Sequence, residues 1–112
     1  MTQRFHTPPS EIEDLAKRLG RNIRLARLRR GIPLSEMATK VGVTRKTMRE
    51  IEQGRTRSAL AHYATALWVL GLHEGLGRIA DPDSDEHGKL LEASRLPQRA
   101  RKPVAPTADY DF

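Results

Sequence analysis

The sequence predicts an all-α protein, and two observations lead to this prediction. Apolar residues recur about every 3.6 residues in several short segments, and glycine or proline stands between those segments. No stretch alternates between apolar and polar residues in the way a half-buried strand does. The 112 residues have the length of one domain, and a hydrophobic content of 38% allows only a small core that the helices must share.

The first predicted helix extends from Ser10 to just before Gly31. Ser10 and Glu13 have the spacing of a capping box, which predicts that Ser10 caps the helix. Gly20 weakens the helix locally. Its apolar stripe consists of Ile12, Leu15, Ala16, Leu19, Ile23 and Ala26.

Two short helices with a turn between them follow. Pro33 is predicted to start the first, and Gly42 to end it in a left-handed conformation. Thr44 is predicted to cap the second, which Gly54 terminates. The inward-facing residues are Leu34, Met37, Ala38 and Val41 in the first helix and Met48 and Ile51 in the second.

The rest of the chain predicts three further helices. Ser58 is expected to cap a fourth helix, which ends before Gly71, and residues 72–79 form a short fifth helix. Asp83 and Glu86 have capping-box spacing for a last helix through about residue 96. The apolar residues expected to face inward are Leu60, Tyr63, Ala64, Leu67 and Leu70 in the fourth helix and Leu72, Leu76 and Ile79 in the fifth, with Trp68 on the edge of the fourth.

From these elements we expect a flexible arm over residues 1–9, a helical domain over 10–80 and a mostly flexible extension over 81–112.

Charge is distributed unevenly along the chain. The net charge is +6, from 20 basic and 14 acidic residues. Residues 17–57 hold thirteen basic and three acidic residues, a net of +10, whereas residues 58–98 hold three basic and six acidic residues, a net of −3. A sign change this large favours a polyanionic partner such as nucleic acid over a merely solvated surface.

The sequence also disfavours several other kinds of site. The absence of cysteine excludes disulfides, thiolate metal sites and cysteine nucleophiles. Four acidic residues fall at positions 1, 3, 5 and 12 of a calcium-binding loop, but Glu86 stands where that loop needs glycine. These four residues are Asp81, Asp83, Asp85 and Glu92. We expect no metal, no cofactor and no enzymatic activity, because no nucleophile motif surrounds any serine or histidine.

No apolar run has the length of a membrane span, and no signal peptide is visible at the start of the chain. The sequence therefore predicts a cytoplasmic protein without a membrane partner.

Residues 37–54 contain the motif that carries the functional prediction. Ala38 is small where two crossing helices must approach, Gly42 forms the turn, Val43 fills the crossing point and Thr44 caps the second helix. This spacing is typical of a helix-turn-helix, which presents the first turn of its second helix to the DNA major groove. Short helices bounded by glycine also occur in ordinary helical bundles, but here the first turn is basic.

Arginine and lysine suit the O6 and N7 atoms of guanine, and the threonine methyl can pack on thymine. We therefore predict four base-contacting residues, namely Arg45, Lys46, Thr47 and Arg49, and three residues that contact the DNA backbone, namely Thr44, Arg55 and Arg57.

Residues 19–72 resemble the Xre/Cro-type helix-turn-helix domain that lambdoid phage repressors share. The matching residues are Leu19, Gly20, Ile23, Arg24, Arg27, Gly31, Met37, Ala38, Gly42, Val43, Thr44, Ile51, Glu52, Gln53, Gly54, Leu70 and Gly71. The resemblance implies a five-helix lambda-repressor-like domain, here followed by a short C-terminal helix and a flexible tail, that binds double-stranded DNA. It also implies a structural ion pair between Arg27 and Glu52. Pro33 and Leu34 stand where the family has a polar cap and a phosphate-binding glutamine, so Arg55 and Arg57 would supply backbone contacts instead.

The end of the chain resembles that of HipB-like antitoxins, which are encoded beside HipA-like serine/threonine-kinase toxins. The matching residues are Ile79 to Pro82, Asp85, Glu86, Gly88, Leu90, Leu91 and Arg95 to Lys102. This resemblance implies a homodimeric transcriptional repressor that autoregulates its operon from an inverted repeat and holds the kinase inactive. Two alternatives remain, a stand-alone Xre-type regulator without a toxin and a protein-interaction module that does not read DNA.

Three segments outside the motif are candidates for protein contacts. The fifth helix, with Leu72, Leu76 and Ile79, is the candidate dimer interface, and residues 81–112 are the candidate toxin-docking segment. Leu25 and Leu28 lie opposite the apolar stripe of the first helix, either as isolated surface leucines or as an interface. Residues 109–112 form either a solvated tail or a docking peptide.

Overall fold

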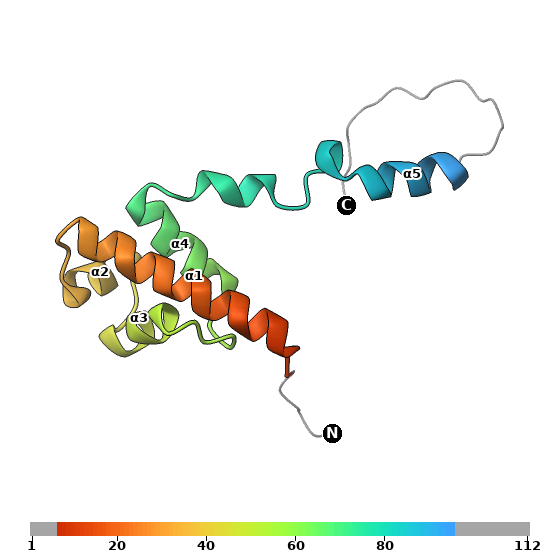
Figure 1. The fold of residues 1–112 in the computed structure, drawn as a ribbon. Coiled ribbons are helices and arrows are strands. Elements are labelled where there is room, and N and C mark those ends of the chain that lie inside the picture. The colour runs from red at the N-terminus through yellow and green to blue at the C-terminus, as the bar shows by residue number, and fades with distance from the viewer. Residues whose placement is uncertain (1–6, 96–112) are drawn as a thin grey trace. The chain divides into compact units, whose positions relative to one another are not determined.

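The computed structural model describes residues 7–95 and is all-helical over that range, with no strand, as predicted (Figure 1). The helices are α1 (Ser10–Arg29), α2 (Leu34–Val41), α3 (Arg45–Glu52), α4 (Leu60–Leu70), the 3₁₀-helices η1 (Glu74–Arg78) and η2 (Pro82–Ser84), and α5 (Glu86–Arg95). The chain divides into two compact units between Gly77 and Arg78. Within residues 7–95, no helix combines the length and the apolar character needed to cross a membrane.

Helices α1 to α4 share the core of the first unit. Its four largest fully buried side chains come from α1, α2 and α3, and α4 adds Tyr63, Leu67 and Leu70. Those four are Ile23, Met37, Met48 and Ile51. All of these residues were predicted to face inward from the helical periodicity, and the structure confirms that prediction.

Several apolar residues that were predicted to face inward are exposed instead. Leu60, the first residue of α4, is 75% exposed, and Ile12 and Leu15 near the start of α1 are also exposed. Helix α1 has 20 residues and spans about 30 Å, whereas α2 and α3 have eight residues each and span about 12 Å. The first turns of α1 therefore extend past the helices that would cover them (Figure 1).

The structure confirms one predicted N-cap in this unit and corrects three predicted helix starts. Thr44 caps α3, and its Oγ1 accepts a hydrogen bond from the Thr47 backbone N–H at 3.0 Å. Pro9, Pro33 and Ala59 occupy the N-cap positions of α1, α2 and α4, and none of them supplies a side-chain hydrogen bond.

The three residues that were predicted to start these helices take other positions. Ser10 is the first helical residue of α1, because the extended backbone of Pro9 already starts that helix. Pro33 precedes α2 instead of beginning it. Ser58 belongs to a turn before α4, where its backbone N–H donates to the carbonyl of Arg55 at 3.2 Å.

The segment after α4 departs further from the prediction. The predicted fifth helix is the short 3₁₀-helix η1, which contains Gly75 and Gly77 and ends at Arg78. Only Leu76 of its predicted apolar residues packs on the core, whereas Leu72 and Ile79 are exposed.

The described part of the second unit, residues 78–95, contains two capped helices and no buried residue. The Asp81 carboxylate accepts from the Asp83 N–H at 3.0 Å and caps η2, and the Asp85 carboxylate accepts from the Gly88 N–H at 2.9 Å at the start of α5. Asp83 is therefore not the cap of the last helix, since the short helix η2 intervenes. No residue of α5 is buried. The predictions for residues 1–6 and 96–112, including the docking peptide at 109–112, lie outside the described residues.

Gly20 allows α1 to approach the C-terminal end of α3 closely. A Cβ atom at this position would lie 2.6 Å from the carbonyl oxygen of Ile51 and 2.7 Å from both the carbonyl oxygen of Glu52 and the backbone nitrogen of Gly54. Gly54 contributes from the other side, because it has a φ of +74° and lies against the backbone of Ala16. The sequence showed Gly20 only as a weak point of the helix, and the structure shows that it is required by packing.

We expect Gly20→Ala to destabilise the protein by about 1–3 kcal/mol, because the added methyl group overpacks against backbone atoms that no side-chain rotation can move. Gly75→Ala is the matched control, since a Cβ at Gly75 meets no atom within 4 Å. Urea unfolding followed by circular dichroism would measure both variants. A Gly20→Ala variant as stable as wild type would contradict the close approach.

Candidate nucleic-acid interface

The turn between α2 and α3 is held by backbone hydrogen bonds to one carbonyl. Gly42 adopts a left-handed conformation with a φ of 87°, and the N–H groups of Gly42 and Val43 donate to the carbonyl of Ala38 at 2.8 and 2.9 Å. Ala38 is buried, and the half-buried Val43 packs on the core. The sequence roles predicted for these three residues are confirmed, and together they fix the direction in which α3 leaves α2.

Helix α3 is anchored along one face and open along the other. Met48, Ile51 and Glu52 are buried, whereas Arg45, Lys46 and Arg49 are exposed. The remaining predicted base contact, Thr47, is half-buried, and its hydroxyl accepts a hydrogen bond from the Thr44 hydroxyl at 3.0 Å. The exposed face thus presents three cations beside the positive N-terminal end of a helix, which attracts a polyanion.

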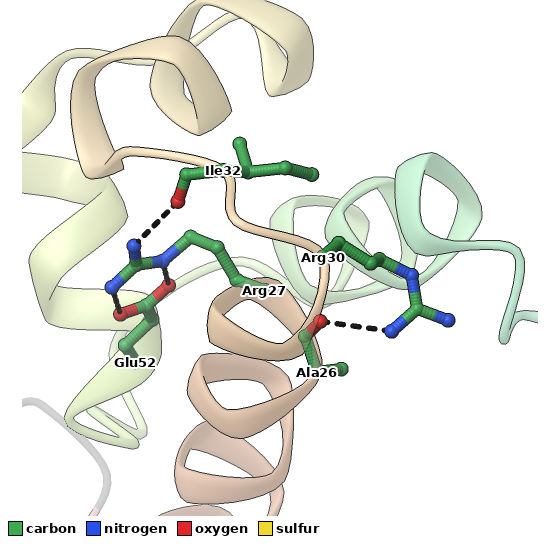
Figure 2. Close-up of polar contacts among 5 residues, drawn as sticks. All are labelled: Ala26, Arg27, Arg30, Ile32 and Glu52. Atoms are coloured by element: carbon green, nitrogen blue, oxygen red, sulfur yellow. Dashed lines mark hydrogen bonds and ion pairs between the residues drawn. The ribbon is translucent and has the colours of Figure 1, made fainter.

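A buried ion pair connects α3 to the rest of the domain (Figure 2). The Arg27 Nε atom donates to Glu52 Oε2 at 2.6 Å, and Nη2 donates to Oε1 at 3.0 Å, so the contact is bidentate. Nη1 donates to the backbone carbonyl of Ile32 at 2.8 Å. Arg27 and Glu52 are only 7% and 8% exposed. One guanidinium group therefore joins α1, the α1–α2 loop and the last residue of α3.

Arg30 lies one turn after Arg27 but makes a different contact. Its Nη1 atom donates to the carbonyl of Ala26 at 2.8 Å, where α1 ends (Figure 2). This contact satisfies one of the free carbonyls at the helix C-terminus and does not reach α3.

The loop between α3 and α4 carries the two predicted backbone contacts, Arg55 and Arg57, both exposed. The Arg55 N–H donates to the carbonyl of Glu50 at 3.1 Å, and its side chain donates to Gln53 Oε1 at 3.1 Å. The Arg55 carbonyl accepts two hydrogen bonds, from the Ser58 N–H at 3.2 Å and from the Tyr63 hydroxyl at 2.7 Å. The loop is therefore closed by contacts at both of its ends.

The sequence predicts that Tyr63 lies in the core, but it indicates no role for the hydroxyl. The residue is 6% exposed, and burial raises the pKa of its phenol above the ordinary value of 10.0, although a hydrogen bond with Ser58 and the charge of Arg55 lower it. The phenol is therefore neutral at physiological pH and able to donate. A buried tyrosine hydroxyl needs a partner, but the sequence does not show that this partner is a backbone carbonyl eight residues earlier.

A surface hollow lies between α3 and the start of α4. Its lining consists of Thr47, Glu50, Arg55, Thr56, Arg57, Ser58, Ala59 and His62. The hollow brings one predicted base contact, Thr47, together with the predicted backbone contacts Arg55 and Arg57, but it does not include Thr44, Arg45, Lys46 or Arg49. The sequence did not indicate that Glu50 or His62 belongs to this surface, because Glu50 is an acidic residue of a basic helix and His62 lies outside the motif.

The N-terminus of α2 lacks the polar contact that the family resemblance would supply. Pro33 has no side-chain oxygen to cap the helix, and the half-buried Leu34 packs on the core. The exposed cations that were predicted to contact DNA all lie on α3 and on the loop that follows it.

Comparison with known proteins agrees with this geometry. Residues 18–76, more than half of the chain, match the family described as a helix-turn-helix domain. This protein belongs to the helix-turn-helix family. The match supports the resemblance of its core to Xre-type domains. Neither the curated proteins nor the solved structures give a significant match.

The helix-turn-helix domain indicates a DNA-binding regulator. Family membership agrees with the exposed basic face of α3, since this is the helix that such domains present to the major groove.

Removing one partner of the Arg27–Glu52 pair should cost about 3–5 kcal/mol, because the other charge is left buried without compensation. We expect this loss for Arg27→Met, and a partial recovery when Glu52→Leu is added to it. Urea unfolding of both single variants and of the double variant would measure the coupling. Additive losses in the double variant would show that the two charges do not depend on each other.

Proposed function

We propose that this helix-turn-helix protein is a sequence-specific transcriptional repressor that binds an inverted-repeat operator as a homodimer. We propose further that it is the antitoxin of a HipA-like serine/threonine-kinase toxin and autoregulates its operon, in the cytoplasm and on the nucleoid. The observation that carries the DNA-binding part is the exposed basic first turn of α3 on a helix whose opposite face is buried.

Base recognition is assigned to α3. Arg45 and Lys46 lie in its first turn and Arg49 lies one turn later, and all three are exposed. Arginine and lysine can each reach the acceptors of guanine in the major groove, and Thr47 can contact a thymine methyl. Because the buried face of α3 is fixed by Glu52 and two apolar side chains, these groups would enter the groove in a defined orientation.

Contacts to the DNA backbone are assigned to the two ends of this surface. Arg55 and Arg57 are exposed beside the hollow, and Thr44 is exposed at the N-terminus of α3. A phosphate next to the hollow would meet two guanidinium groups and the positive end of α4. The carboxylate of Glu50 in the same lining disfavours a deeply seated anion, so the phosphate belongs at the arginine side.

We expect Arg45→Ala or Lys46→Ala to cost about 1–3 kcal/mol on the operator and to relax the preference at one base pair. The operator would first be selected from a random DNA library with the wild-type protein, and gel-shift titrations would then compare it with a scrambled duplex. Arg29→Ala removes an equal charge from an exposed position on α1 and serves as the control. Equal losses on both duplexes would contradict base recognition by these side chains.

The proposed dimer interface lies on the outer face of α4. Trp68 and Leu60 are 62% and 75% exposed there, and Leu72 beyond the helix end is exposed as well. Helix α4 contains no charged residue, although the chain has a net charge of +6. Two copies repel each other least where neither carries charge, and apolar burial favours the same face. This moves the proposed centre of the interface from Leu76 and Ile79 to Trp68.

The proposed toxin contact lies in the acidic extension. Residues 78–95 carry five acidic residues, Asp81, Asp83, Asp85, Glu86 and Glu92, against three basic ones, Arg78, Lys89 and Arg95. Leu90 and Leu91 of α5 are exposed. A segment of this charge adds nothing to the affinity for phosphate, and its apolar residues gain burial only on a partner.

Truncation after Ala80 should leave a folded, dimeric protein that still binds the operator but has lost most of its affinity for the kinase. The kinase to be tested is the product of the neighbouring reading frame. Calorimetry would measure its binding, and sedimentation would measure the dimer. Trp68 is the single tryptophan, so its fluorescence reports burial of the proposed interface directly.

Full kinase affinity in the truncated protein would move the docking surface to the helical core, with Leu25 and Leu28 as the first exposed residues to substitute. A monomeric truncated protein would place the dimer contacts in the extension. If no kinase is encoded beside the gene, the stand-alone regulator becomes the better proposal.

A further inference from the structure

The loop that carries Arg55 and Arg57 has almost no apolar side chains of its own. Residues 53–59 read Gln-Gly-Arg-Thr-Arg-Ser-Ala, and Gly54 is the only one of the seven that is buried. Such a segment cannot hold its conformation by burying side chains, so hydrogen bonds to its backbone must do so. Two arginines on an unconstrained loop would lose much conformational entropy on binding a phosphate.

The carbonyl of Arg55 is the point at which this loop is tied to the core. It accepts the Ser58 N–H at 3.2 Å, which closes a four-residue turn, and the Tyr63 hydroxyl at 2.7 Å, which anchors that turn. Arg57 lies within the turn. The Tyr63 ring belongs to the buried core cluster, whereas the turn itself lies on the surface.

We propose that the Tyr63 hydroxyl positions the turn of residues 55–58 for contact with the DNA backbone. Tyr63 is thus a positioning residue, because it acts through Arg55 and Arg57 and does not itself touch DNA. The inference rests on the proposed DNA-binding function.

The hydroxyl is suited to this role because it is a constant donor. Burial raises the pKa of Tyr63, so the phenol keeps its proton throughout the pH range of a binding assay. Without the hydroxyl, the turn would keep its internal Ser58–Arg55 bond and the bond from the Arg55 N–H to the Glu50 carbonyl, but its carbonyl side would no longer be connected to the core.

Tyr63→Phe removes the hydroxyl and keeps the buried ring, and Tyr110→Phe makes the same chemical change elsewhere in the chain as a control. We expect Tyr63→Phe to weaken binding by about 2- to 10-fold, the range of one net hydrogen bond, on both the operator and a scrambled duplex. The loss should be similar on both duplexes because phosphate contacts do not depend on sequence. Hydrogen exchange of the Ser58 amide should become faster in this variant, with circular dichroism showing an unchanged fold.

A thermodynamic cycle distinguishes positioning from a general effect on the fold. In an Arg55→Ala, Arg57→Ala background, Tyr63→Phe should cause no further loss of affinity, because the side chains that it positions are absent. An equal loss in both backgrounds, or a Tyr63→Phe variant with undiminished affinity, would overturn this role while the proposed function stands. A wild-type protein that bound neither duplex would overturn the proposed function, and this role with it.

Discussion

The bidentate contact between Arg27 and Glu52 is the interaction on which the arrangement of the domain depends. It joins the C-terminal part of α1, the carbonyl of Ile32 and the end of α3 through one buried guanidinium group. Burying two charges costs desolvation, so the pair adds little net stability compared with a well-packed apolar pair. Its contribution is to the specificity of the arrangement, because an orientation of α3 that separated the two groups while they stayed buried would leave both charges unpaired.

Close packing and the ion pair act on the same end of α3. The approach of α1 at Gly20 brings backbone against backbone beside Ile51 and Glu52, and Arg27 lies two turns further along α1. Helix α3 is thereby held at its C-terminal end and capped by Thr44 at its N-terminal end. An eight-residue helix would be marginal alone, so this tertiary support is what keeps its exposed face ordered.

The arginine side chains of this domain differ in role according to whether they are buried or exposed. Arg27 is buried, paired and structural, whereas Arg45 and Arg49 are exposed on the face of α3 that the core leaves open. The loop arginines differ again, because the backbone of Arg55 is fixed through Tyr63 while its side chain lies at the surface. The proposed DNA surface therefore combines a rigid helix with a loop that is anchored by its main chain.

The sequence by itself determined the all-α class, the turn at Gly42, the Thr44 cap and most of the inward-facing residues of α1 to α4, because each of these depends on residues within one or two turns of one another. It also indicated the Arg27–Glu52 pair, through resemblance to a family. Only the tertiary structure decided that Gly20 is a contact point, that Leu60 and Leu15 are exposed and that the Tyr63 hydroxyl reaches the loop. These features depend on where a second helix ends and on backbone atoms distant in sequence, and a periodic pattern along one helix contains no information about either.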